Sequence, residues 1–97
     1  MTTFHEMMNT VKFRGVEGWA HREADLWPLR DILVGLMQDA QNIGSAAYLN
    51  LQRSGLADVA EGSAANTRLF CEMIEADIMT IETYCRSRAI PQPKDGV

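Results

Sequence analysis

Histidine, cysteine and aromatic residues are scarce in this chain of 97 residues. It contains 2 histidines and 2 cysteines, and aromatic residues make up 7% of the sequence. Neither His5 nor His21 is followed by a second histidine or a cysteine three or four positions later, which is the local spacing of many zinc ligands. We therefore expect neither a metal site nor a cofactor.

The motifs of common catalytic and nucleotide-binding sites are also absent. No Gly-x-Ser-x-Gly stretch occurs, and Gly15 and Gly18 are followed neither by Lys-Ser/Thr nor by a third glycine in register. Nothing in the sequence places a base beside either cysteine, so neither is marked as a nucleophile. We expect a protein that is not an enzyme and has no catalytic residue.

Long hydrophobic runs and an excess of positive charge are missing as well. No run of about 18 apolar residues occurs, so we expect no membrane-spanning helix. The first residues lack the basic and then apolar pattern of a secretory signal, so we expect a cytoplasmic protein. The formal net charge of −4 disfavours direct binding to the phosphates of nucleic acids.

Apolar residues, in contrast, are plentiful at 46% and have helical spacing. In residues 28–54 and 58–88, apolar or small residues recur at alternating steps of three and four, as on one face of an α-helix. Gly55 lies between the two stretches and suits the left-handed position that follows a helix. Because so short a connection makes the helices antiparallel, the sequence predicts an all-α helical hairpin within one domain, residues 1–97.

The N-terminal segment, residues 1–25, has a weaker pattern. Thr3 and Glu6 have the spacing of a capping box, and the apolar residues after them predict a short helix over residues 4–14. The alternative is a strand over residues 11–14, where apolar and basic residues alternate. We therefore expect either a short helix or an irregular segment ahead of the hairpin.

Prolines mark the outer ends of the hairpin. Pro28 fits the first turn of a helix because its missing N–H has no partner there, and Asp25 can cap that end. Pro91 and Pro93 stop the second helix. Residues 89–97 are therefore expected to form a flexible tail.

The two cysteines fall on the second predicted helix. Cys71 and Cys85 are 14 residues apart, or about 21 Å along a helix. A disulfide needs Cα atoms within about 7 Å, so they cannot pair within one chain. We interpret them as small buried residues in a reducing compartment, with a disulfide between two chains as the alternative.

The apolar stripes of the two helices are wider than one hairpin can cover. The core or dimer stripe comprises Leu29, Leu33, Leu36, Ile43, Phe70, Ile74, Ile78 and Ile81. Each large side chain left in water would forfeit about 1.5–3 kcal/mol. We therefore expect two hairpins to pair as a four-helix-bundle homodimer. The alternative is a monomer whose open groove binds a different protein.

Acidic residues gather on the second helix, where residues 58–82 contain six acids and one base, Arg68. Its acidic face comprises Glu72, Glu75, Asp77 and Glu82. This face is either solvated or binds a basic surface of a partner protein. Asp77 adjoins the apolar stripe, and we expect it at the rim or paired with Arg30 or Arg53.

These patterns favour a non-enzymatic protein-interaction module that binds a partner protein through its helix faces. One alternative is an inhibitor from a phage or another mobile element, of the anti-CRISPR kind, whose acidic face blocks the basic nucleic-acid-binding surface of a host complex. A second alternative is a regulatory or structural helical bundle that acts through its N-terminal segment. In that case Trp19, His21 and Trp27 form the contact region.

Overall fold

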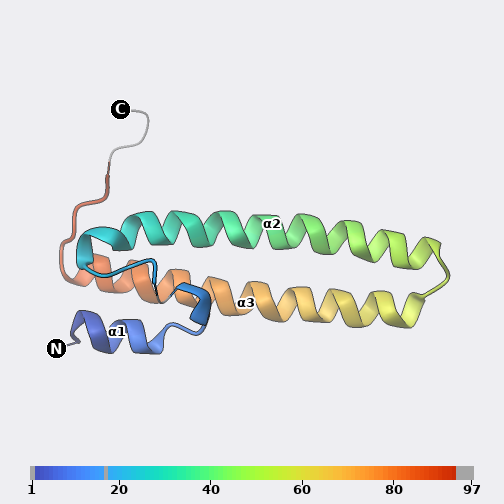
Figure 1. Ribbon diagram of the computed structural model, residues 1–97, viewed down its shortest axis with the longest axis horizontal. Coiled ribbons are helices and arrows are strands. Elements are labelled where there is room, and N and C mark those ends of the chain that lie inside the picture. Colours follow the sequence, from blue (N-terminus) through green and yellow to red (C-terminus); the bar gives the residue numbers. More distant parts are fainter. Residues whose placement is uncertain (1, 17, 94–97) are drawn as a thin grey trace.

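The chain folds as a long helical hairpin with a short helix beside it, as a computed structural model of residues 2–16 and 18–93 shows. The helices are α1 (Phe4–Thr10), α2 (Leu26–Arg53) and α3 (Ala57–Ser87), and two single 3₁₀ turns, Arg14–Val16 and Glu23–Asp25, lie between α1 and α2. Helices α2 and α3 run antiparallel side by side, and α1 lies beside α3 (Figure 1). No strand occurs in the described ranges, so the predicted all-α hairpin is confirmed.

The helix boundaries follow from local chemistry. Glu6 N–H donates to Thr3 Oγ1 at 3.1 Å, and Thr3 N–H donates to Glu6 Oε1 at 3.1 Å, which completes the predicted capping box of α1. That helix ends at Thr10 rather than at residue 14, because Val11 is extended (φ −66°, ψ 129°). The next backbone N–H groups then bond to a side chain of α3 instead of continuing the helix, and no strand forms there either.

Both long helices end in the same hydrogen-bond pattern. At the end of α2, Leu56 N–H donates to Leu51 O, and Gly55 has a φ of 78°. At the end of α3, Ile90 N–H donates to Cys85 O, and Ala89 has a φ of 54°. These are Schellman motifs, which need a left-handed residue just after the helix. The second motif turns Ile90 back against the core, although it belongs to the predicted flexible tail; residues 94–97 of that tail lie outside the described residues.

The core lies at one end of the hairpin. We call residues 2–36 and 70–93 the packed half, and residues 37–69 the loop half. Nearly all buried apolar side chains belong to the packed half: Met7, Val11, Val16, Ala20, Leu26, Trp27, Leu29, Leu33, Ile74, Ile78, Ile81, Tyr84 and Cys85. In the loop half only Ala60 is buried. None of the described helices is long and apolar enough to cross a membrane.

The connection from α1 to α2 closes the packed half. We call residues 11–16 and 18–25 the strap; it crosses the hairpin near the start of α2 (Figure 1). Val11, Val16 and Ala20 are its buried anchors. The ring of Phe13 packs edge-on against that of Phe70 at 5.7 Å, and this contact lies at the boundary with the loop half.

Candidate interaction faces of the hairpin

One face of the loop half carries a groove between α2 and α3 of about 660 Å³. Its lining residues are Gln41, Gly44, Ser45, Tyr48, Leu49, Glu61, Ala64, Thr67, Arg68 and Cys71. We call this side the groove face. Its floor is tight, because a Cβ at Gly44 would lie 2.6 Å from Thr67 Cγ2. The glycine therefore lets the two helices approach closely, while the walls combine apolar surface with the polar groups of Gln41, Tyr48 and Glu61.

A hydrogen-bond chain fixes the polar wall of this groove. The Tyr48 hydroxyl donates to Glu61 Oε1 at 2.9 Å, and Gln52 Nε2 donates to Tyr48 Oη at 2.8 Å. The hydrogen bond to Glu61 raises the pKa of the Tyr48 hydroxyl, so that group stays a neutral donor at physiological pH. This polar wall was not predicted. The sequence did contain a signal for this contact: Tyr48 and Glu61 lie nearly the same number of residues from the turn at Gly55, so an antiparallel hairpin places them opposite each other.

The predicted acidic face divides into free and engaged carboxylates. Glu72 and Glu75 are exposed and make no ion pair with any described residue. Glu82 is half-buried, and its Oε2 forms an ion pair with Arg30 Nε at 3.0 Å. Arg30 also stacks over the ring of Trp27, with 5.1 Å from its Cζ to the ring centroid. Only the first two carboxylates are therefore available to a partner.

Asp77 does not belong to an exposed acidic face, which corrects the sequence prediction. Its side chain is buried at 1% exposure, and it pairs with neither Arg30 nor Arg53. Instead its two oxygens accept backbone N–H groups of Lys12 at 2.7 Å and Phe13 at 2.8 Å. A buried carboxylate needs such donors to replace water. Asp77 is thus the anchor of the strap.

The opposite side of the hairpin, which we call the strap face, carries large apolar side chains. In the packed half the strap covers it through the Asp77 and Phe70 contacts. In the loop half it stays open: Ile43 is 70% exposed, Val59 53% and Leu69 63%. Ile43 is therefore not part of the intramolecular core, although the predicted stripe included it. The other members of that stripe are buried or half-buried.

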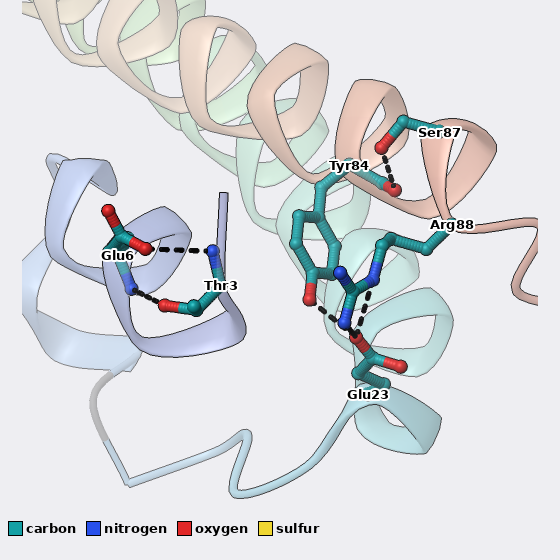
Figure 2. A network of polar contacts seen from close by, with 6 residues as sticks. All are labelled: Thr3, Glu6, Glu23, Tyr84, Ser87 and Arg88. Carbon is teal, nitrogen blue, oxygen red and sulfur yellow. Dashed lines mark hydrogen bonds and ion pairs between the residues drawn. The ribbon is translucent and has the colours of Figure 1, made fainter. Parts of the chain in front are cut away.

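The end of the hairpin where α2 begins holds a second polar cluster, in which Tyr84 and Arg88 both point toward Glu23 of the strap (Figure 2). The Tyr84 hydroxyl donates to Glu23 Oε2, and Arg88 Nε lies 3.2 Å from the same oxygen. The bond from Tyr84 lowers the pKa of the Glu23 carboxyl, with a further contribution from the positive charge of Arg88. Burial raises the pKa of the Tyr84 hydroxyl. This cluster was also not predicted, since it joins residues 61 or more positions apart.

The three residues of the alternative N-terminal contact region lie in different environments. Trp27 is 5% exposed, and its Nε1 donates to Ile90 O at 3.1 Å, so it is a core residue rather than a contact residue. Trp19 is 47% exposed. His21 is also exposed, and its backbone N–H donates to Asp25 Oδ2 at 2.9 Å. Only Trp19 and His21 present side chains to solvent.

The two cysteines of this hairpin lie in different environments. Both cysteines are free, and burial raises the pKa of the Cys85 thiol, which keeps it protonated. Cys71 is half-buried in the groove, with its Sγ 3.9 Å from Met37 O. In the described ranges, no group of three or more His, Cys, Asp or Glu side chains is placed to hold a metal ion.

The two faces thus offer different kinds of contact. The groove face presents hydrogen-bonding groups beside free carboxylates, and the strap face of the loop half presents large apolar side chains. No protein-family model, curated protein or solved structure matches this chain. These two faces are its candidate interaction sites.

Proposed function

We propose that this chain is a non-enzymatic protein-interaction module that binds through the helix faces of its loop half. One observation carries the proposal. The loop half exposes five large apolar side chains, Ile43, Leu49, Leu56, Val59 and Leu69, and buries only Ala60. Such a segment adds little to the core of its own chain, whereas exposed apolar surface of this extent is typical of binding sites.

The charge of the groove face defines the kind of partner it fits. Along residues 57–75 of α3, the side that carries the groove-lining residues also carries three acids, Glu61, Glu72 and Glu75, and one base, Arg68, for a net charge of −2. Glu72 and Glu75 lie just beyond the loop half, on the same side of the helix. The carboxylates of Glu72 and Glu75 are free of intramolecular ion pairs among the described residues. A basic helix or surface of a partner protein complements this face, since opposite potentials favour both encounter and register.

A model peptide provides a direct test. An amphipathic 18-residue helix of leucine and lysine should bind the chain, and its leucine–glutamate counterpart should not. Reversing both free carboxylates, as Glu72→Lys with Glu75→Lys, should weaken binding of the basic peptide about 10-fold, as expected for two charge contacts of about 0.7 kcal/mol each. Fluorescence anisotropy of labelled peptide measures this.

The matched control is the double variant Asp31→Lys with Asp58→Lys. It makes the same charge change at two exposed positions outside residues 61–75 of α3, of which Asp31 also gives up its ion pair with Arg30. We expect it to bind the basic peptide within about 3-fold of the original chain, because distant surface charges are screened by salt. If the Glu72 and Glu75 double variant binds as tightly as the original chain, the acidic groove face is not the site.

A narrower form of this function is inhibition of a basic nucleic-acid-binding protein, as expected for an inhibitor from a mobile element. The observation in its favour is that Glu72 and Glu75 lie one helical turn apart on an exposed side of α3, where they mimic spaced phosphate charges. The chain should then release the lysine peptide from labelled duplex DNA. Release that is equally strong with the Glu72 and Glu75 double variant would count against this form.

A further inference from the structure

The open part of the strap face has two parallel stripes. On α2, Asp39, Ile43, Ala46, Asn50 and Arg53 follow one another at steps of four and three, so they share one side of the helix. On α3, Val59, Gly62, Asn66 and Leu69 do the same. All of them are exposed, and the groove-lining residues lie on the opposite side.

The register of the hairpin aligns these stripes. Three pairs face each other across α2 and α3: Arg30 with Glu82, Gly44 with Thr67, and Tyr48 with Glu61. Their residue numbers sum to 112, 111 and 109 respectively. A residue of α2 and a residue of α3 whose numbers sum to about 110 therefore lie opposite each other along the hairpin. Ala46 of α2 is accordingly opposite Ala64 of α3.

About that level, the strap face is complementary to itself. Asp39 and Arg53 lie seven residues before and after Ala46, and they carry opposite charges. Val59 and Leu69 lie five residues before and after position 64, and both are apolar. A twofold symmetric contact requires this arrangement, since residue i of one copy meets residue j of the other, and the reverse.

We propose that the strap face of the loop half binds a second copy of this chain, antiparallel, with the twofold axis passing level with Ala46. Asp39 of each copy then faces Arg53 of the other, and Val59 of each faces Leu69 of the other. Helix α2 packs on α2 and α3 on α3, so the dimer is an antiparallel four-helix bundle over the loop halves. The small residues Ala46 and Gly62 lie near the axis and allow close approach.

The available area suits such a dimer. The open surface runs from the strap edge at Phe13 and Phe70 to the turn at Gly55, or about 25 Å along the helices, and two helices are about 20 Å wide. This gives about 500 Å² per copy and about 1,000 Å² in total, which reaches the lower size of specific interfaces. Leu56 at the turn, 48% exposed, meets the strap edge of the other copy.

A second copy suits this surface better than a charged partner does. Asp39 and Arg53 are the charged residues of the two stripes, and their charges cancel. The face therefore carries no net charge, in contrast to the acidic groove face. The same register leaves the groove face on the outside of the dimer, where it stays open to a different protein.

The first test is the solution mass. Light scattering over about 1 μM to 1 mM should show a concentration-dependent dimer, as expected for an interface near the lower size limit. Leu69→Glu should raise the dissociation constant at least 50-fold. The matched control is Leu49→Glu, which changes an equally large side chain, 50% exposed, outside the two stripes. It should leave the dissociation constant within about 3-fold, and circular dichroism should show equal helix content in both variants.

Charge exchange tests the register. Asp39→Arg and Arg53→Asp should each raise the dissociation constant about 10-fold, because each change places like charges opposite one another twice per dimer. The double variant restores opposite charges and should return to within about 3-fold of the original chain. A double variant no better than either single one would overturn the proposed register.

Two results would overturn the proposal itself. One is a mass that stays monomeric up to 1 mM. The other is a dimer that tolerates Leu69→Glu but dissociates when Glu61 or Arg68 is reversed in charge, which would assign the dimer to the groove face. The first result does not bear on the groove-face proposal, because binding of the lysine peptide by Leu69→Glu is measured separately and should be unchanged. The second result would mean that a second copy competes with the lysine peptide for the groove face.

Discussion

The packed half and the loop half use the same two helices in different ways. In the packed half, large side chains such as Leu29 and Leu33 meet Ile74 and Ile81, and all four are fully buried. In the loop half, small residues hold the helices together, and Gly44 packs directly against the side chain of Thr67. Close approach of small residues fixes the geometry of the hairpin, but it removes little apolar area from water.

This difference separates stability from binding along one hairpin. The strap, α1 and the end of α3 all add contacts to the packed half, so most of the free energy of unfolding should arise there. The loop half projects from it as a continuation of the same helices and keeps its large side chains exposed. Substitutions at matched positions in the two halves should therefore have very different effects.

The largest effect is expected from core truncation. Leu33→Ala should lower the free energy of unfolding by about 3 kcal/mol, because Leu33 is 0% exposed and its removal leaves a cavity. Ile43→Ala, on the same helix but 70% exposed, should change it by less than about 0.5 kcal/mol at concentrations where the chain is monomeric. Urea unfolding followed by circular dichroism measures both. Equal losses would contradict the division into two halves.

The next largest effect is expected at the strap anchor. Asp77→Ala should cost about 2 kcal/mol, since the backbone N–H groups of Lys12 and Phe13 lose their acceptors. Glu72→Ala removes an exposed carboxylate from the same helix and should be nearly neutral. Amide hydrogen exchange should show faster exchange at Lys12 and Phe13 in the first variant. Unchanged protection there would mean that Asp77 does not hold the strap.

Helix periodicity and turn chemistry predicted the hairpin well because both are local. The two long helices begin and end within two residues of the predicted ranges, whereas α1 ends four residues earlier than predicted. The apolar stripe was less accurate further along α2. On a straight α-helix, residues that repeat every seven positions rotate by about 20° around the helix axis with each repeat. The predicted stripe therefore turns away from α3 along α2, and the contact with α3 is made by Gly44 instead of the predicted Ile43.

The role of Asp77 was beyond sequence reasoning for a different reason. The sequence around Asp77 predicts that its side chain lies between the apolar stripe and the acidic side of α3. Whether that side chain is buried depends on the path that the strap takes across α3. That path depends on bonds to residues 64 and 65 positions away. The Glu23 cluster is of the same kind, whereas Glu72 and Glu75 were correctly placed on an exposed surface because nothing folds over them.

A smaller, paired effect is expected at the two helix ends. Gly55→Ala should cost about 1 kcal/mol, because its φ of 78° strains any residue with a Cβ. Ala89→Gly should stabilise the chain by about 0.5 kcal/mol, because it relieves the same strain at a φ of 54° and loses part of the gain to backbone entropy. Thermal unfolding of both variants checks the opposite signs. Destabilisation by Ala89→Gly would contradict the strain at this position.

The smallest effect on stability is expected when the pH is lowered, and the loss of stability should be confined to the strap. The pKa of the Glu23 carboxyl is lowered by the hydrogen bond from Tyr84, and Arg88 adds to this, so the ionised form stabilises the folded strap. This stabilisation is complete above the ordinary pKa of 4.5 and is lost as the pH falls through the lower folded value. Amide resonances of the strap, such as that of His21, should therefore shift as the pH falls through this lowered value.

Glu23→Gln separates this carboxyl from its neighbour Asp25, whose pKa is also lowered, chiefly by the His21 N–H. The variant keeps a hydrogen-bonding side chain but has no charge to lose, so the acid step assigned to Glu23 should disappear while that of Asp25 remains. Resonances of Thr67 in the loop half should not follow the Glu23 step in either protein, because Thr67 packs against Gly44 rather than against the strap. If Thr67 shifted together with His21, the strap and the loop half would unfold as one unit, and the two halves would not be separable in stability.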